Sequence, residues 1–83
     1  KTDDWRLTGQ YDYLLFAKLK ELIPSDYLKT LDNPEYFHEH CEFCMTKPED
    51  NKEQKFYCTL DNYRWICEEC YNDFKEKFKF EKL

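Results

Sequence analysis

The sequence predicts a single α+β domain over residues 1–83, with a helical amino-terminal part (1–35) followed by a cross-linked module (36–83). Three observations lead to this fold class. A chain of only 83 residues gains marginal stability from its hydrophobic core alone, so an additional cross-link is expected. Its apolar residues recur at helical spacing near both ends, and two short β-type runs lie between them. Its cysteines stand mainly in two closely spaced pairs in the second half.

The composition is acidic and rich in aromatic side chains. Asp and Glu number 18 against 13 Lys and Arg, which gives a formal net charge of -5. This balance disfavours nonspecific attraction to phosphate backbones, which depends on Lys and Arg. Seven Tyr, seven Phe and two Trp can build a small core around an organising centre. The longest uninterrupted apolar run covers only residues 13–17, so we expect neither a membrane span nor a secretory signal, and a cytoplasmic protein.

The amino-terminal part is predicted to be helical. Over residues 10–23, apolar side chains recur at three-to-four spacing, and a proline follows the run. The side chains that set this spacing are Tyr11, Leu15, Leu19 and Leu22. Tyr13 and Leu14 would project from the other side, so this helix carries more apolar surface than one core contact requires. A brief second helix is predicted over residues 25–31, with Ser25 as its cap.

Four of the five cysteines form two Cys-x-x-Cys pairs, and 22 residues separate the pairs. The members are Cys41, Cys44, Cys67 and Cys70. A two-residue gap lets both sulfurs of a tight turn point at one ion, and two such pairs supply four thiolates at about 2.3 Å for tetrahedral Zn²⁺. Disulfides are the alternative, but a Cys-x-x-Cys disulfide closes a very short loop, and the cysteine count is odd. We therefore expect one structural Zn²⁺ bound by these four cysteines.

Three further residues near these pairs need an assignment. His38 and His40 closely precede Cys41, and one of them could replace a thiolate in a mixed site. Two matched cysteine pairs make this replacement unnecessary, so we expect both histidines beside the site rather than in it. Cys58 has no partner at the same spacing and lies in the apolar run Phe-Tyr-Cys, which predicts a packed strand residue.

The module from residue 36 onward is predicted as a cysteine turn, a β-hairpin and a helix. The hairpin strands are expected at 55–59 and 63–66, joined by Leu-Asp-Asn. A helix is expected from Glu68 to about residue 79, with its aromatic residues on one face. This order places the second cysteine pair at a helix start, as in a small zinc-stapled treble-clef-like domain, with the amino-terminal helix packed on it. In the alternative, a zinc ribbon, the second pair would lie on another hairpin.

Three segments resemble a group of short bacterial proteins of uncharacterised function. They are Trp-Arg-Leu-Thr-Gly-Gln near the amino end, His-Glu-His-Cys-Glu-Phe-Cys in the middle, and the stretch 63–78. The similar pattern covers most of the chain. The resemblance implies Cys-x-x-Cys turns, an acidic residue between the two histidines, here Glu39, and an aromatic-rich carboxyl-terminal helix. It supports the metal site and implies no established activity.

The pattern of titratable residues argues against an enzyme. A nuclease of the His-Asn-His type needs catalytic and metal-binding histidines after the first cysteine pair, and no histidine follows His40. The stretch His40-Cys41-Glu42 matches the His-x-Glu signature of zinc deaminases, but no proline stands directly before Cys67 and the first cysteine pair would be left unused. Four thiolates also close the coordination sphere of Zn²⁺, which leaves no position for water or substrate.

A protein partner is predicted instead. The acidic charge and the surplus of aromatic residues favour a non-catalytic protein-interaction module, such as an immunity-type or antitoxin-type inhibitor of a basic toxin, or an adaptor. Tyr13 and Phe80 are expected contacts, although Phe80 would fold back if the last helix ended before it. The alternative is a small nucleic-acid-binding or transcription-regulatory zinc protein, for which Lys75, Lys79 and Lys82 would form one basic side of the last helix.

Overall fold

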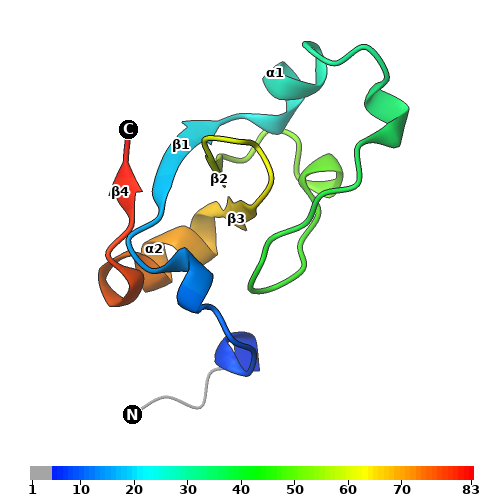
Figure 1. The fold of residues 1–83 in the computed structure, drawn as a ribbon. Helices are drawn as coiled ribbons and strands as arrows, with labels where there is room; N and C mark the ends of the chain where they lie inside the picture. Colours follow the sequence, from blue (N-terminus) through cyan, green and yellow to red (C-terminus); the bar gives the residue numbers. More distant parts are fainter. Residues whose placement is uncertain (1–4) are drawn as a thin grey trace.

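The computed structural model describes residues 5–83 as a mixed α+β fold (Figure 1); residues 1–4 of the predicted domain lie outside this range. The described chain forms strands β1 (Lys18–Leu22), β2 (Phe56–Thr59), β3 (Trp65–Cys67) and β4 (Glu81–Lys82), and helices α1 (Pro24–Leu28) and α2 (Glu68–Phe78). Short 3-10 turns are η1 (Trp5–Leu7), η2 (Asp12–Leu14), η3 (Pro34–Tyr36) and η4 (Pro48–Asp50). None of the helices formed by residues 5–83 has the length and apolar character of a membrane span.

The four strands of the described chain form one sheet in the order β3-β2-β1-β4. β2 pairs antiparallel with both β1 and β3, and β4 pairs parallel with β1. The predicted hairpin is confirmed, because β2 and β3 are antiparallel and joined by a turn in which Asn62 has a φ of 62°. Asn tolerates this left-handed conformation better than most residues. The additional pairing with β1 matters because an isolated hairpin is only marginally stable in water.

The predicted helix over residues 10–23 is wrong. Within that segment, Asp12–Leu14 form only a 3-10 turn, and the end of the segment is strand β1. Short apolar runs fit helix and strand patterns alike, and an isolated helix of this length is marginal in water. β1 instead gains hydrogen-bonded neighbours on both of its edges, so tertiary pairing outweighs the local helix propensity.

The burial of this segment also differs from the prediction. Leu14 and Leu19 are fully buried, whereas Leu15 and Phe16 are exposed. The chain turns at Phe16, whose φ is 60° and whose backbone N–H donates to the carbonyl of Phe78 at 2.8 Å. Because the turn separates η2 from β1, the continuous apolar helix face does not form.

The brief second helix predicted over residues 25–31 is present but starts earlier and is shorter, as α1. Pro24 occupies its first turn, where the missing N–H has no helical partner to lose. Ser25 is not the cap, since the N-cap residue is Ile23. The N–H of Ser25 donates instead to the carbonyl of Lys52 at 2.9 Å, which ties α1 to the segment after η4.

The predicted carboxyl-terminal helix is confirmed as α2, with its aromatic residues buried on one face. It ends at Phe78 because Lys79 adopts a left-handed φ of 55°. Phe80 then folds back and stacks with both Tyr71 and Phe78. The centroid of the Phe80 ring lies 5.7 Å from the centroid of each of these two rings. Phe80 is therefore part of the packed aromatic cluster and not an exposed contact.

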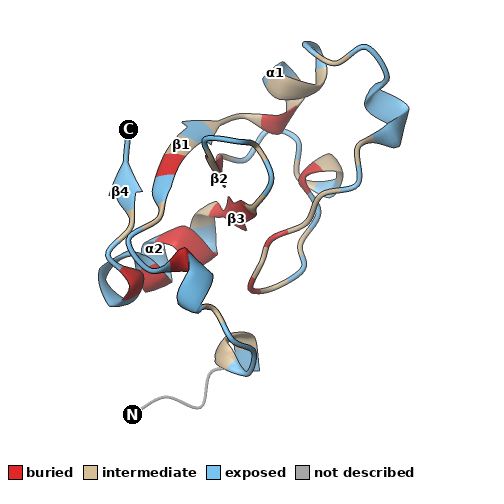
Figure 2. Ribbon diagram, in the orientation of Figure 1, coloured by how far each residue is buried: buried red, intermediate tan, exposed pale blue. Residues whose placement is uncertain are grey.

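The core lies on both faces of the sheet, and its buried residues come mainly from the strands and α2 (Figure 2). Successive residues of a strand point to opposite faces, and residues 56–58 of β2 are all buried. On one face, Tyr57 stacks on Tyr71 of α2 with ring centroids 3.7 Å apart. On the other face, Trp65 of β3 packs edge-on against Tyr27 of α1 at 5.3 Å. Aromatic side chains from both sides thus build the core that the composition predicts.

Candidate metal centre

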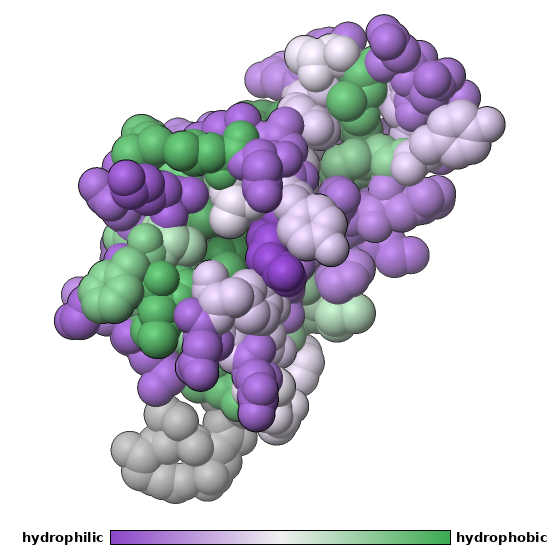
Figure 3. All heavy atoms as spheres, viewed as in Figure 1, coloured by the Kyte–Doolittle hydropathy of each residue, from purple (hydrophilic) through white to green (hydrophobic). Residues whose placement is uncertain are grey.

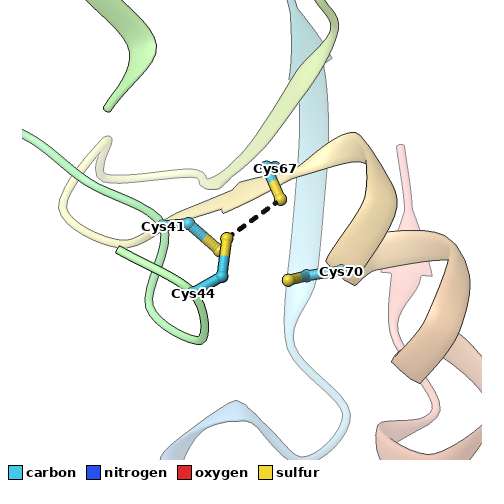
Figure 4. A group of neighbouring side chains, drawn as sticks. All are labelled: Cys41, Cys44, Cys67 and Cys70. Carbon is cyan, nitrogen blue, oxygen red and sulfur yellow. Dashed lines mark hydrogen bonds between the residues drawn. The ribbon is translucent and has the colours of Figure 1, made fainter. Parts of the chain in front are cut away.

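Four cysteine sulfurs meet at one edge of the sheet (Figure 4). They come from the turn of Cys41 and Cys44, from Cys67 at the end of β3, and from Cys70 in the first turn of α2. Their Sγ atoms all lie within 4.8 Å of one another and point into a shared space. The structure therefore brings together the four thiols of the two Cys-x-x-Cys pairs.

The first pair is positioned by a tight turn that backbone hydrogen bonds close. The N–H of Cys41 donates to the carbonyl of Thr46 at 2.8 Å, and the N–H of Met45 donates to the carbonyl of Cys41 at 3.1 Å. Met45 takes a φ of 68° to complete the turn. The backbone N–H of Phe43 donates to Sγ of Cys41 at 3.4 Å, and such a donor favours negative charge on the sulfur.

The turn is docked onto β3, next to the second pair. Cys41 forms an isolated parallel bridge with Trp65, and the N–H of Glu42 donates to the carbonyl of Trp65 at 2.8 Å. Because Trp65 and Cys67 belong to the same short strand, this bridge sets the separation of the two pairs. Cys67 is the N-cap residue of α2. Residues three apart at a helix start lie on one side of it, so Cys67 and Cys70 face the turn together.

All five cysteines are free thiols. Three of the four cluster cysteines are buried, and Cys44 is half-buried. The thiols of Cys67 and Cys70 donate hydrogen bonds that lower the pKa of Cys41, and the same bonds raise the pKa of Cys67 and of Cys70. Hydrogen bonding between the thiols therefore favours the thiolate of Cys41 and the protonated forms of Cys67 and Cys70.

The donor set fits a tetrahedral metal ion. Four sulfurs at about 2.3 Å from Zn²⁺ stand about 3.8 Å from one another in a regular tetrahedron, and the separations of up to 4.8 Å in the cluster are close to that spacing. Thiolates are soft ligands, which suit Zn²⁺ and iron–sulfur centres but not Mg²⁺ or Ca²⁺. The four cysteines could therefore hold one metal ion, and with all four bound its coordination sphere would be complete.

The two histidines and the fifth cysteine are not members of this cluster. His38 is exposed, and Nδ1 of His40 donates to the carbonyl of Cys41 at 3.1 Å. Cys58 is fully buried in β2, where its thiol lies 3.8 Å from Oδ1 of Asn62. Burial raises the pKa of Cys58 to about 11. These placements agree with histidines beside the site and with Cys58 as a packed strand residue.

Two polar side chains that contact the cluster are absent from the sequence predictions. Nη1 of Arg6 donates to Sγ of Cys70 at 3.4 Å, and the thiol of Cys44 donates to Oγ1 of Thr46 at 3.2 Å. A metal-bound thiolate can only accept, so the Thr46 hydroxyl would be the donor in that state. The two-residue spacing of Cys44 and Thr46 within one turn is a signal for their contact. Arg6 and Cys70 are 64 positions apart, and only the tertiary fold brings them together.

Tyr13 is exposed, as expected, but it also makes contacts. Its hydroxyl donates to Oε1 of Glu42 at 2.7 Å, and the guanidinium carbon of Arg64 lies 4.0 Å from its ring centroid. Arg64 also pairs with Glu42 at 3.3 Å. Burial and the hydrogen bond to Glu42 raise the pKa of Tyr13 to about 12. One face of the Tyr13 ring is therefore already occupied by Arg64.

Comparisons of the chain with protein-family models, with curated proteins and with solved structures found no match. A function is therefore inferred from the residues and their geometry alone.

Proposed function

We propose that this chain is a non-catalytic module that is held together by one structural Zn²⁺ and acts by binding a protein partner. Bound by Cys41, Cys44, Cys67 and Cys70, the metal would cross-link the cysteine turn, β3 and α2. A turn, a hairpin and a helix that starts at the second pair have the order of a treble-clef-like domain. Sulfur would fill all four coordination positions, which leaves none for a substrate.

The protein partner is inferred from an uneven distribution of charge. Residues 24–55 contain eight acidic residues and four lysines, a net charge of -4, whereas residues 5–23 and 56–83 together contain eight residues of each sign. The segment 24–55 forms much of the predominantly hydrophilic end at the upper right of the molecule (Figure 3). Four thiolates around one Zn²⁺ would add a further net charge of about -2 relative to neutral thiols. Such a surface is complementary to a basic partner.

An exposed aromatic side chain stands within this acidic segment. Tyr36 of η3 is 74% exposed, the largest fraction among the exposed large hydrophobic residues of the described chain. It follows Glu35 directly, and both Glu35 and Asp32 are exposed. A Tyr ring offers a large contact area with few rotamers to lose, and interface binding energy concentrates in such residues. The exposure of Tyr36 in a segment of net negative charge is the observation that carries the proposal.

Within this class, we favour an inhibitor of a basic toxin, of the immunity or antitoxin type, or a small adaptor. Either role would use an acidic surface on a fold that Zn²⁺ stabilises, with the exposed Tyr36 ring as its main aromatic contact. The negative charge would speed the encounter with a basic protein, and the Tyr36 ring would slow dissociation of the complex. A bacterial origin, which the resemblance of the cysteine segments implies, is compatible with both roles.

A nucleic-acid-binding role has weaker support. The basic side predicted on the last helix does not form there, because α2 ends at Phe78 and Lys82 lies in β4, with its Nζ 2.9 Å from Oε1 of Glu21. Nζ of Lys75 lies 5.9 Å from the centroid of the Tyr71 ring, so this side chain runs along the aromatic cluster. The acidic residues of the same helix further dilute its positive charge.

Affinity purification from the native host, followed by mass spectrometry, tests the proposal. We expect the zinc-loaded protein to retain one basic protein at a fixed stoichiometry, and Tyr36→Ala to retain much less of it. Tyr63→Ala is the matched control, because Tyr63 is also exposed but lies outside residues 24–55. Recovery of nucleic acid without a protein would favour the regulatory alternative, and equal recovery by the Tyr36→Ala variant would remove the aromatic anchor from the proposal.

A further inference from the structure

Arg6 connects the amino-terminal segment to the cysteine cluster. It lies in η1, and its Nη1 is 3.4 Å from Sγ of Cys70 and 3.0 Å from Oδ2 of Asp73. Its guanidinium carbon lies 4.5 Å from the centroid of the Phe74 ring. Residues at these spacings share one face of a helix. The guanidinium therefore covers the face of α2 that carries the last cysteine of the cluster.

This guanidinium is largely withdrawn from water, since the side chain of Arg6 is only 15% exposed. Removing a charged group from water is unfavourable unless hydrogen bonds and opposite charge compensate for it. The Asp73 carboxylate supplies one opposite charge, but its side chain is 46% exposed and remains accessible to solvent. Cys70 is buried, so its sulfur meets the guanidinium away from solvent.

A four-thiolate centre needs donors of this kind. Four thiolates and one divalent ion carry a net charge of about -2, which the surrounding protein must stabilise. On the turn side, the backbone N–H of Phe43 already donates to Cys41. On the helix side, Arg6 offers a donor with a full positive charge, and charge-assisted hydrogen bonds are roughly twice as strong as neutral ones.

We propose that Arg6 is a positioning residue for the metal centre, whose guanidinium donates to the metal-bound thiolate of Cys70 and so couples the docking of η1 to metal binding. The inference rests on the four-cysteine zinc site proposed above. The coupling is reciprocal, because docking of η1 strengthens metal binding by the same factor by which metal binding strengthens docking. The docked position of η1 then depends on the bound metal ion.

Competition for Zn²⁺ with a chromophoric chelator tests this role. Arg6→Met keeps most of the side-chain length but removes the charge and the donors, and it should weaken zinc binding about tenfold, as is common for groups that hold metal ligands. Asp73→Asn is the matched control, because it removes the ion pair but leaves the contact with sulfur. It should weaken zinc binding at most about threefold. Arg6→Lys keeps the charge and should recover part of the loss.

A spectroscopic measurement separates hydrogen bonding from a general loss of stability. In the Co²⁺-substituted protein, the thiolate-to-metal charge-transfer band reports the energy of the sulfur lone pairs. A hydrogen bond to sulfur lowers that energy, so loss of the donor in Arg6→Met should move the band to longer wavelength. Asp73→Asn should leave the band in place.

The outcomes distinguish this inference from the proposed function. If the wild-type protein binds no metal, both fail. If the wild type binds Zn²⁺ and Arg6→Met matches its affinity within about twofold, with an unshifted band, only the role of Arg6 is overturned. An equal loss of affinity in Asp73→Asn would also overturn it, because the ion pair would then carry the effect. Should Arg6→Met fail to fold, Arg6→Lys replaces it and must show a weaker affinity and a band shift that Asp73→Asn lacks.

Discussion

Sγ of Cys44 lies 3.5 Å from Sγ of Cys67, although the two are 23 positions apart in the sequence. The first belongs to a half-buried turn, and the second ends a buried strand. In a disulfide the two sulfurs would be about 2.05 Å apart, and two thiolates this close would repel each other strongly without a cation between them. A metal ion bound by both sulfurs would allow both to be thiolates at this spacing.

We predict that the purified protein binds one Zn²⁺ per chain. Native mass spectrometry should show a single metal in the wild type and its loss in Cys41→Ser, because three sulfurs do not complete the tetrahedral set of a structural site. Cys58→Ser keeps all four cluster sulfurs and is the matched control. Full zinc occupancy in Cys41→Ser, or loss of zinc in Cys58→Ser, would show that the ligand set is wrong. His38→Ala and His40→Ala should retain the metal.

Removal of the metal should unfold much of the chain. A structural Zn²⁺ contributes an apparent free energy of about 10 kcal/mol or more, which is comparable to the whole stability of a small domain. Without it, the turn that carries Cys41 would be joined to α2 by weak thiol hydrogen bonds. Chelation should abolish the helical circular dichroism signal and the cooperative thermal transition, and added Zn²⁺ should restore both. A metal-free protein that melts cooperatively at the same temperature would contradict this expectation.

The cysteine cluster and α2 could be predicted because each depends on spacing within a short segment. A two-residue gap brings two sulfurs to one side of a turn, and aromatic residues at helical spacing mark one face of α2. The error over residues 10–23 has another origin. The spacing of Leu15 and Leu19 fits a helix as well as a strand, and pairing of Leu19 with Thr59 in β2 decides between them.

Contacts between distant segments leave no periodic signal. Arg6 and Cys70 are 64 residues apart, and Tyr13 and Glu42 are 29 apart. Such pairs follow only from the tertiary fold. The end of α2 is similarly unmarked, because the left-handed position after a helix usually holds Gly or Asn and here holds Lys79.

Met45 should carry backbone strain at the cysteine turn. Its φ of 68° lies in the left-handed region, which costs a non-glycine residue roughly 1 kcal/mol, and its side chain is exposed. Met45→Gly should therefore be at least as stable as the wild type. Met45→Val should weaken both folding and zinc affinity, because a β-branched residue fits this region poorly. Thermal denaturation and chelator competition measure the two effects, and equal behaviour of the Gly and Val variants would argue against strain.

Cys58 should resist thiol reagents while the protein is folded. Burial raises its pKa from 9.0 to about 11, and the thiolate is the reactive form. Iodoacetamide at mildly alkaline pH should leave Cys58 unmodified in the zinc-loaded protein and modify it after denaturation, as read by peptide mass spectrometry. Modification of Cys58 at equal rates before and after denaturation would contradict its placement in the core.

The same shift in pKa makes the folded protein less stable at high pH. Between about pH 9 and pH 11, the unfolded chain releases the Cys58 proton that the folded chain retains. The contribution of Cys58 to the free energy of unfolding is therefore constant below about pH 9. It falls as the pH rises from about 9 to about 11. Denaturant titrations at several pH values measure the slope.

Acidic and aromatic side chains should have separate effects on the kinetics of partner binding. Asp50 and Glu53 are exposed, whereas the neighbouring Glu49 is half-buried. Replacing Asp50 and Glu53 by their amides should slow association and weaken its salt dependence, because exposed charges act mainly on the encounter. The dissociation rate should change little, since neither side chain would be an anchor.

Truncation of an aromatic anchor should instead speed dissociation. Tyr36→Ala should weaken the complex by about 2 kcal/mol, roughly a 30-fold increase in the dissociation rate, while the fold survives because the ring is exposed. Tyr13→Ala should have a smaller effect, since Arg64 already covers one face of that ring. Phe80→Ala should destabilise the fold, because Phe80 stacks within the aromatic cluster. Surface plasmon resonance with the captured partner measures both rates, and a Tyr36→Ala variant that lost affinity only through slower association would contradict an anchoring role.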